Sequence, residues 1–252
     1  MDYLKICKKY REAFEKEIRN VDLEARGMLP SEVLLIYSVA KELGIKQIYE
    51  SGRARGYSTY VLAKTLPKIP ITSIDFDKHS KDTRYAKKRL AEFENVELTH
   101  GNAMKILPEM ISQKSVVVID SPKGEMALVL AANLLKNAKV KAVFIHDLSR
   151  DLFERTIAQQ LFPGAYHTDN KKHVKEFSDL DNGYSNSGES YGGPLTMILN
   201  EKGALDTEVI KQYIQYYDKE RNVLRKALKN QIESRGWLYS IFVKLQRLFK
   251  QK

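Results

Sequence analysis

The chain has 252 residues, which is enough for one α/β domain of ordinary size with a small appendage. Hydrophobic residues make up 43% of the sequence, so a packed core is expected, and the single cysteine excludes an intramolecular disulfide framework and fits a reducing compartment. The net charge of +10 is concentrated near the C-terminus: residues 211–252 hold eleven Lys or Arg against three Asp or Glu, which argues against a catalytic domain that binds nucleic acid over its whole face.

The sequence shows no targeting or membrane-spanning segment. No apolar run follows a basic start at the N-terminus, so we expect no signal peptide. No uncharged apolar stretch reaches the roughly 18 residues of a membrane-spanning helix. We therefore expect a cytoplasmic protein.

Residues 1–45 are expected to form an N-terminal helical cap. Apolar side chains recur at helical spacing through residues 3–19, with Lys, Arg and Glu between them. Ser31 can then cap a second helix over residues 32–43, which ends at Gly44. The first of these is expected to be a packing helix that implies no chemistry.

A strand, a glycine turn and a helix follow one another between residues 46 and 66. Glu50 closes the strand, and Gly52 and Gly56 allow a tight turn in which the backbone can approach a ligand closely. Ser58 and Thr59 are candidate N-caps for the apolar segment that follows. This layout aims backbone N–H groups and a helix N-terminus at a nucleotide-like ligand.

The spacing of the turn discriminates between ligands. A dinucleotide fingerprint would need glycine at positions 54 and 57, where the chain has Ala54 and Tyr57. The stretch instead resembles the E-x-G-x-G-x-G motif of class I S-adenosylmethionine-dependent methyltransferases: Glu50, Gly52 and Gly56 match, and Ala54, flanked by two arginines, replaces the middle glycine. The alternative is an ordinary strand-to-helix turn.

Strands and helices alternate through the rest of residues 46–200, which predicts a doubly wound, mostly parallel seven-stranded sheet with helices on both faces. We expect further parallel strands at residues 71–74, 96–99, 115–119 and 142–145. Residues 174–177 and 195–199 are expected to close the sheet as an antiparallel pair.

Acidic residues follow the apolar part of four strands, namely Glu50, Asp75, Asp120 and Asp147. Open α/β sheets bind ligands outside the carboxyl ends of their strands, so we expect these groups to converge on one crevice. Asp75 lies 19 residues beyond Gly56 and can accept two hydrogen bonds from ribose hydroxyls, with Asp77 as the fallback assignment.

The resemblance implies a cofactor site for S-adenosylmethionine. The residues implied are Glu50, Gly52, Gly56, Ser58, Asp75, Asn102 and Asp120. Asn102 resembles the family's G-D-A segment, whose side chain reads the adenine amino group, although an ordinary turn residue would look the same. In the resemblance, residues 26–29 lie over the cofactor and acceptor pocket.

The segment Asp120-Ser-Pro-Lys123 resembles the I-D-x-x-K segment of cation-dependent catechol-type and related sugar O-methyltransferases. There the Asp binds a divalent cation and the Lys can take the proton of the acceptor hydroxyl. Asp120 and Asp147 would supply two oxygen ligands for Mg²⁺, and Lys123 beside a cation would have a depressed pKa and act as a base. Leu148 stands where the catechol-type family has Asn, so the third ligand is missing or comes from elsewhere.

His146 is a second candidate base, or else a core histidine. The predicted reaction is transfer of a methyl group to a hydroxyl on a small molecule or glycan, with Asp120, Lys123 and His146 at the acceptor. Tyr184 and Tyr191, in a Gly/Ser-rich loop, are candidates to close over that acceptor. Two rivals stay open: an RNA or protein methyltransferase guided by the basic tail, and a non-catalytic module that has kept the fold.

Residues 201–252 are expected to form a basic helical extension, with one helix over residues 206–233 and an amphipathic one over residues 237–249. The apolar face of the second must be covered by the protein's own core, by a second subunit or by a membrane surface. Its aromatic residues and surplus of Lys and Arg favour peripheral association with an anionic bilayer at the inner membrane surface, with homodimerisation as the next choice.

Overall fold

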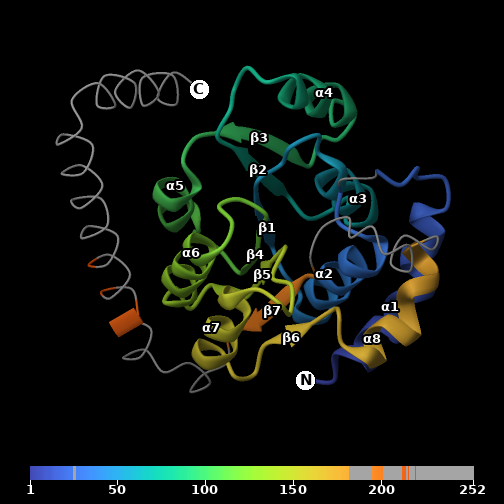
Figure 1. Ribbon diagram of the computed structural model, residues 1–252. Coiled ribbons are helices and arrows are strands. Elements are labelled where there is room, and N and C mark those ends of the chain that lie inside the picture. The colour runs from blue at the N-terminus through green and yellow to red at the C-terminus, as the bar shows by residue number, and fades with distance from the viewer. Residues whose placement is uncertain (25–26, 182–193, 201–211, 214, 216–218, 220–252) are drawn as a thin grey trace, which may run out of the picture. The chain divides into compact units, whose positions relative to one another are not determined.

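The computed structural model describes residues 1–24, 27–181 and 194–200, together with the helical positions 212, 213, 215 and 219 (Figure 1). It divides into two compact units, residues 1–205 and 206–252, and nearly all described residues belong to the first. The loop tyrosines at positions 184 and 191, the helix expected over residues 237–249 and most of the one expected over residues 206–233 lie outside the described residues. The domain boundaries expected from the sequence stay predictions.

The described part of the chain is built on a seven-stranded sheet in the order β3-β2-β1-β4-β5-β7-β6. The strands are β1 (Gln47–Ser51), β2 (Ile71–Asp75), β3 (Val96–His100), β4 (Ser115–Ile119), β5 (Val140–Ile145), β6 (Tyr166–His167) and β7 (Thr196–Leu199). Strands β1 to β5 are parallel, and β7 runs antiparallel between β5 and β6. The predicted fold class is therefore confirmed. The strand order reverses between β1 and β4, which is where open α/β sheets bind ligands.

Helices cover both faces of this sheet. They are α1 (Tyr3–Ile18), α2 (Pro30–Leu43), α3 (Tyr57–Thr65), α4 (Lys81–Arg89), α5 (Ala103–Met110), α6 (Glu125–Leu135), α7 (Phe153–Leu161) and α8 (Lys171–Phe177). Figure 1 shows α1, α2 and α3 on one side of the sheet and α5, α6 and α7 on the other. No helix among the described residues is long and apolar enough to cross a membrane.

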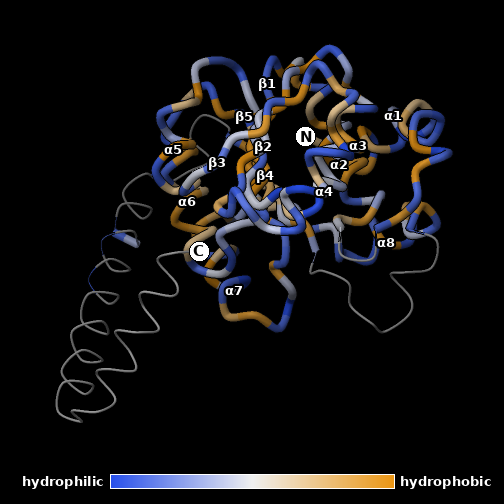
Figure 2. Tube along the Cα trace, turned by 90° about the horizontal axis from the view of Figure 1, so that it is seen from above, coloured by the Kyte–Doolittle hydropathy of each residue, from blue (hydrophilic) through white to orange (hydrophobic). Residues whose placement is uncertain are grey.

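The core lies between the central strands and the inner helices. Val116 to Ile119 in β4 are fully buried, as four successive β-branched residues of a strand covered on both faces should be. Residues 30–40 of α2 are all buried, so this helix is enclosed on every side. Figure 2 shows hydrophobic segments along the sheet and hydrophilic ones in many of the connections around it.

The prediction of a strand at residues 174–177 is wrong. This segment is the C-terminal half of α8. The strand that pairs with the outer edge of β7 is instead β6, which is only two residues long. Asn170 caps α8 by accepting a hydrogen bond from the backbone N–H of His173. His173 and Phe177, one helical turn apart, are both buried, and their ring centroids lie 4.9 Å apart. The apolar residues of this segment therefore follow a helical period.

Three hydroxyl side chains predicted as helix caps have other partners. Helix α2 begins at Pro30 with Leu29 as its N-cap, and the Ser31 hydroxyl donates to the carboxylate of Asp181, 2.7 Å away. Helix α3 begins at Tyr57 with Gly56 as its N-cap, and the hydroxyls at positions 58 and 59 donate to the carboxylate of Glu50. A buried carboxylate without hydrogen-bond donors costs more free energy than an uncapped helix end that faces a cavity.

Candidate active site

The glycine turn lies directly against the backbone that follows β4. Gly52 has φ +89°, and a β-carbon added to it would lie 2.5 Å from the backbone nitrogen of Ser121 and 2.6 Å from the carbonyl carbon of Asp120. Only glycine fits there. Ala54, at the position of the family's middle glycine, has φ +44° and so keeps the left-handed conformation at a cost of about 1 kcal/mol.

Arg53 connects this turn to the sheet by hydrogen bonds. Its side chain is 2% exposed, and Nη1 donates to the carbonyl oxygen of Ser73 at 2.6 Å and to that of Thr99 at 3.5 Å. The other two nitrogens, Nε and Nη2, are buried without a hydrogen-bond partner among the described residues. The guanidinium thus ties the turn to β2 and β3 and leaves donors unsatisfied beside the expected cofactor site.

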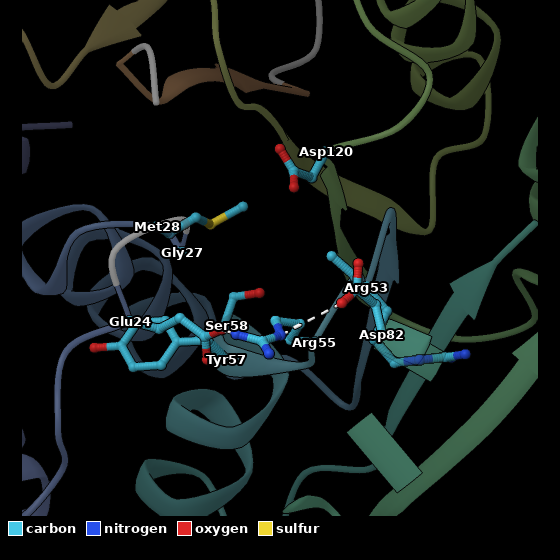
Figure 3. Close-up of a pocket in the computed structure, with 10 residues that line it drawn as sticks. Glu24, Gly27, Met28, Arg53, Arg55, Tyr57, Ser58, Asp82 and Asp120 are labelled. Atoms are coloured by element: carbon cyan, nitrogen blue, oxygen red, sulfur yellow. Dashed lines mark hydrogen bonds and ion pairs between the residues drawn. The ribbon is translucent and has the colours of Figure 1, made fainter. Parts of the chain in front are cut away.

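Arg55 points the other way, to the edge of the cavity drawn in Figure 3. Its guanidinium lies 3.0 Å from a carboxylate oxygen of Glu24 and 3.3 Å from one of Asp82, and it stacks over the ring of Tyr85, 4.6 Å from the centroid. The two arginines that flank Ala54 therefore bond to different parts of the molecule, Arg53 to the sheet and Arg55 to side chains at the edge of the cavity.

Glu50 lies beneath the turn and, like Asp75 and Asp147, lines neither of the two cavities described below. It is fully buried and accepts hydrogen bonds from the hydroxyls of Ser58 and Thr59 and from that of Ser73 at 2.9 Å. Burial raises the pKa of the Glu50 carboxyl, and the three hydroxyl donors offset part of that rise. Glu50 supports the turn from within the core.

Asp75 connects the end of β2 to the turn. Its Oδ2 accepts a hydrogen bond from the backbone N–H of Ala54 at 3.0 Å, and its Oδ1 accepts one from Asp77 at 3.1 Å. Asn102 caps α5, with its side-chain oxygen 3.0 Å from the backbone nitrogen of Met104. The structure therefore shows a capping role for the Asn102 oxygen, the alternative that its sequence context left open.

Two cavities flank the glycine turn. One has a volume of about 280 Å³ and is lined by Glu24, Gly27, Met28, Arg53, Ala54, Arg55, Tyr57, Ser58, Asp82 and Asp120. The other, of about 160 Å³, is lined by Gly52, Ile74, Phe76, Gly101, Asn102, Ala103, Met104, Ser121, Pro122 and Met126. In Figure 3, Met28 and Asp120 lie across the first cavity from Arg55 and Asp82. Of the segment expected over the pocket, residues 26–29, Gly27 and Met28 line this cavity.

The ends of β4 and β5 bring the predicted acceptor residues together. The Lys123 ammonium donates to the carboxylates of both Asp120 and Asp147. His146, with a 6% exposed side chain, places Nδ1 2.7 Å from Oδ1 of Asp120 and 3.4 Å from Oδ1 of Asp147. The four residues form one charged cluster, as the convergence of strand ends predicts.

The charges in this cluster hold protons on its two bases. Burial alone would lower the pKa of His146, but the carboxylates of Glu32 and Asp120 outweigh it and raise that pKa to about 10. Burial would likewise lower the pKa of Lys123, and Asp120 and Asp147 raise it instead. The depressed pKa expected for Lys123 is therefore not found in the metal-free cluster. Both side chains are cations at neutral pH.

Glu32 is the member of the site that sequence reasoning missed. It is 3% exposed, and its Oε2 lies 3.4 Å from Nε2 of His146. One sequence signal was available: a carboxylate in the first turn of a helix whose residues 30–40 are otherwise uncharged. A charged side chain on an enclosed helix needs a partner in the core.

The donor set fits a divalent cation only in part. Asp120, His146 and Asp147 each offer one ligand atom, and these atoms lie within 4.8 Å of one another. The Lys123 ammonium, however, bonds to both carboxylates, and Leu148, 1% exposed, has no side-chain oxygen to offer. A cation on Asp120 and Asp147 would have to displace Lys123. Metal binding by these two residues stays a prediction.

Comparisons with known proteins give structural likenesses and one family match. Three solved structures are similar to this chain at low identity: a methyltransferase from Podospora anserina bound to S-adenosylhomocysteine (15% identity, 78% of this chain and 92% of that one, TM-score 0.44), the O-methyltransferase TomG from Streptomyces achromogenes with S-adenosylmethionine (19%, 77% and 89%, 0.44) and an O-methyltransferase from Bacillus cereus with S-adenosylhomocysteine (15%, 77% and 90%, 0.45). No curated protein sequence matches the chain.

The family match, rather than these likenesses, identifies the domain. The strand order and the helices on both faces are those of the Rossmann-like methyltransferase fold. Residues 28–145, just under half of the chain, match the model of the O-methyltransferase family. The protein is thus an S-adenosylmethionine-dependent O-methyltransferase.

Proposed function

We propose that this O-methyltransferase methylates a hydroxyl of a small molecule, with Asp120, Lys123 and His146 facing the acceptor. The observation that carries the proposal is the charged cluster after β4 and β5, one of whose members, Asp120, also lines the larger cavity beside the glycine turn. Donor and acceptor can then meet at one carboxylate, and holding them in line is the largest task of such an enzyme.

In this proposal the cofactor occupies both cavities, across the turn. Asp75 accepts hydrogen bonds from its ribose, and Gly52 and Asn102 line the cavity for its adenine. Ser58 and Asp120 line the cavity for its amino-acid end. When bound, S-adenosylmethionine supplies an electrophilic methyl group on sulfur.

The protonation state of the cluster favours an acidic acceptor. Lys123 and His146 are both cations, so they can stabilise an acceptor oxyanion, whereas either would first have to lose a proton to act as a base. A phenolic hydroxyl, with an ordinary pKa of about 10, loses its proton beside two cations more readily than the less acidic hydroxyl of a sugar. Between the two acceptor classes expected from the sequence, a small molecule with an acidic hydroxyl therefore fits better than a glycan.

The alternative is a cation-assisted reaction. A divalent cation on Asp120 and Asp147 would polarise the acceptor hydroxyl in place of the two side-chain cations. Because Lys123 bonds to both carboxylates, the two arrangements exclude each other.

A labelling experiment separates these versions. Methyl-labelled S-adenosylmethionine is incubated with a panel of phenols and a panel of sugars, with and without EDTA. We expect the phenols to be methylated in EDTA, and Lys123→Met to reduce turnover by on the order of 100-fold. The matched control is Lys136→Met, which removes an exposed lysine at the end of α6. Methylation of sugars alone, or a loss in EDTA that equals the loss in Asp120→Ala, would overturn the proposal.

Peripheral membrane binding through residues 237–249 is a separate proposal that rests on their sequence alone. Liposome flotation compares the full-length protein with a chain truncated after Ser234. Flotation with anionic vesicles that the truncation abolishes would support it. If the full-length protein stays at the bottom and truncation changes a dimer into a monomer, the segment joins two subunits instead. Salt-sensitive RNA binding lost on the same truncation would favour a nucleic-acid substrate.

A further inference from the structure

Glu32 is a fully engaged carboxylate at the start of α2. Its Oε2 accepts a hydrogen bond from the backbone N–H of Leu29 at 2.8 Å. Its Oε1 accepts one from the backbone N–H of Leu195 at 3.0 Å and one from the Thr168 hydroxyl at 3.4 Å. The fourth neighbour is Nε2 of His146, at 3.4 Å. One side chain therefore links the first turn of α2, the residue before β7, the residue after β6 and the end of β5.

His146 lies between two carboxylates. Nδ1 is 2.7 Å from Asp120, and Nε2, which is buried and has no closer partner among the described residues, faces Glu32. Rotating the His146 side chain about its Cα–Cβ bond would move both ring nitrogens away from these carboxylate oxygens. The two carboxylates thus fix the orientation of the ring, in the way that second partners orient functional histidines.

We propose that Glu32 is a positioning residue for methyl transfer, which holds the His146 ring so that Nδ1 meets Asp120. The inference rests on the proposed role of His146 at the acceptor. Glu32 lines neither of the two cavities beside the glycine turn, so it does not touch the cofactor there. In this proposal its influence on the reaction passes through His146.

The chain provides a matched control on the same helical turn. Asp181 is 1% exposed and accepts hydrogen bonds from the backbone N–H and the hydroxyl of Ser31, the residue before Glu32. Like Glu32, it is a buried carboxylate that holds the first turn of α2. It makes no contact with His146 in the described structure. An acid-to-amide change at each position therefore perturbs the same turn, with and without the histidine.

The test is a double-mutant cycle on the full-length enzyme. Glu32→Gln, His146→Gln and the double variant are compared for kcat, acceptor KM, melting temperature and S-adenosylhomocysteine affinity. We expect Glu32→Gln to lower kcat by roughly 10- to 100-fold, as removal of an orienting partner does, with cofactor affinity unchanged. The double variant should match His146→Gln alone, because the two changes remove one interaction. Asp181→Asn should change the melting temperature and leave kcat unchanged.

Two outcomes overturn the inference: a wild-type kcat in Glu32→Gln, or losses in the two single variants that multiply in the double variant. A wild-type kcat in His146→Gln has a different meaning, since it refutes the proposed role of His146 and with it the inference. If Glu32→Gln does not fold, Glu32→Asp takes its place in the cycle. That change keeps the charge but withdraws the carboxylate by one methylene, and the same non-additivity is expected.

Discussion

Replacing Gly52 by alanine should remove cofactor binding while leaving a folded chain. The new β-carbon would lie 2.5 Å from the backbone nitrogen of Ser121, so the turn must move away from the strand end by roughly 1 Å. Strain at φ +89° adds about 1–2 kcal/mol and the overlap about 1–3 kcal/mol, together about 2–5 kcal/mol. A domain of ordinary stability, about 5–15 kcal/mol, survives that loss.

The assay is thermal unfolding with and without S-adenosylhomocysteine. At a ligand concentration of about 100 times Kd, binding stabilises the wild type by about 2.7 kcal/mol, which raises Tm by roughly 5–10 °C in a chain of this size. Gly52→Ala should show a lower Tm and no ligand-induced rise. Gly44→Ala is the control, because Gly44 has φ +57° and open space around its missing β-carbon. A full ligand-induced rise in Gly52→Ala would refute the reasoning.

Three further predictions concern single residues. Ala54→Gly should raise stability by about 1 kcal/mol by relieving the φ of +44°, measured by denaturant unfolding; a loss of stability would contradict this. Arg55→Gln should weaken binding of S-adenosylhomocysteine, because Arg55 lies at the edge of the cavity proposed for the amino-acid tail of the cofactor. It should not weaken binding of 5′-methylthioadenosine, which lacks that tail. Equal losses of affinity for the two ligands in calorimetry would exclude this role of Arg55. Burial raises the pKa of Asp181 from 3.8 to about 6, so its contribution to stability is present below pH 3.8 and is lost as the pH rises through 6. Asp181→Asn should lack this loss of about 2–3 kcal/mol, and parallel stability curves would contradict it.

Much of the fold was predictable because its elements carry strong local patterns. The four β-branched residues from Val116 to Ile119 predicted β4, and the alternation of such runs with helices predicted the parallel sheet. The closing strand pair was less accessible. Strand β6 has only two residues, too few to show a period, and Val174 with Phe177 suggested a strand that the capped helix α8 overrides.

The candidate site, like the fold, was predictable from the sequence only in part. The meeting of Asp120, Lys123, His146 and Asp147 followed from the sheet, because carboxyl ends of neighbouring parallel strands lie side by side. The hydrogen bonds and ion pairs that each of these side chains forms could not be predicted from the sheet. Glu32 and His146 are more than 100 residues apart in the sequence, and no local pattern connects them. The pKa of Lys123 depends on the same pairing, since two carboxylates hold its proton where a nearby metal cation would repel it.

In the proposed site, S-adenosylmethionine binds at the glycine turn and Asp75 accepts hydrogen bonds from its ribose. Calorimetric titration with S-adenosylhomocysteine of the wild type, Asp75→Ala and Asp77→Ala tests it most directly. We predict one binding site in the wild type, an affinity about tenfold or more weaker in Asp75→Ala, as loss of charged hydrogen bonds entails, and little change in Asp77→Ala. No binding by the wild type, or equal affinity in Asp75→Ala, would contradict the account.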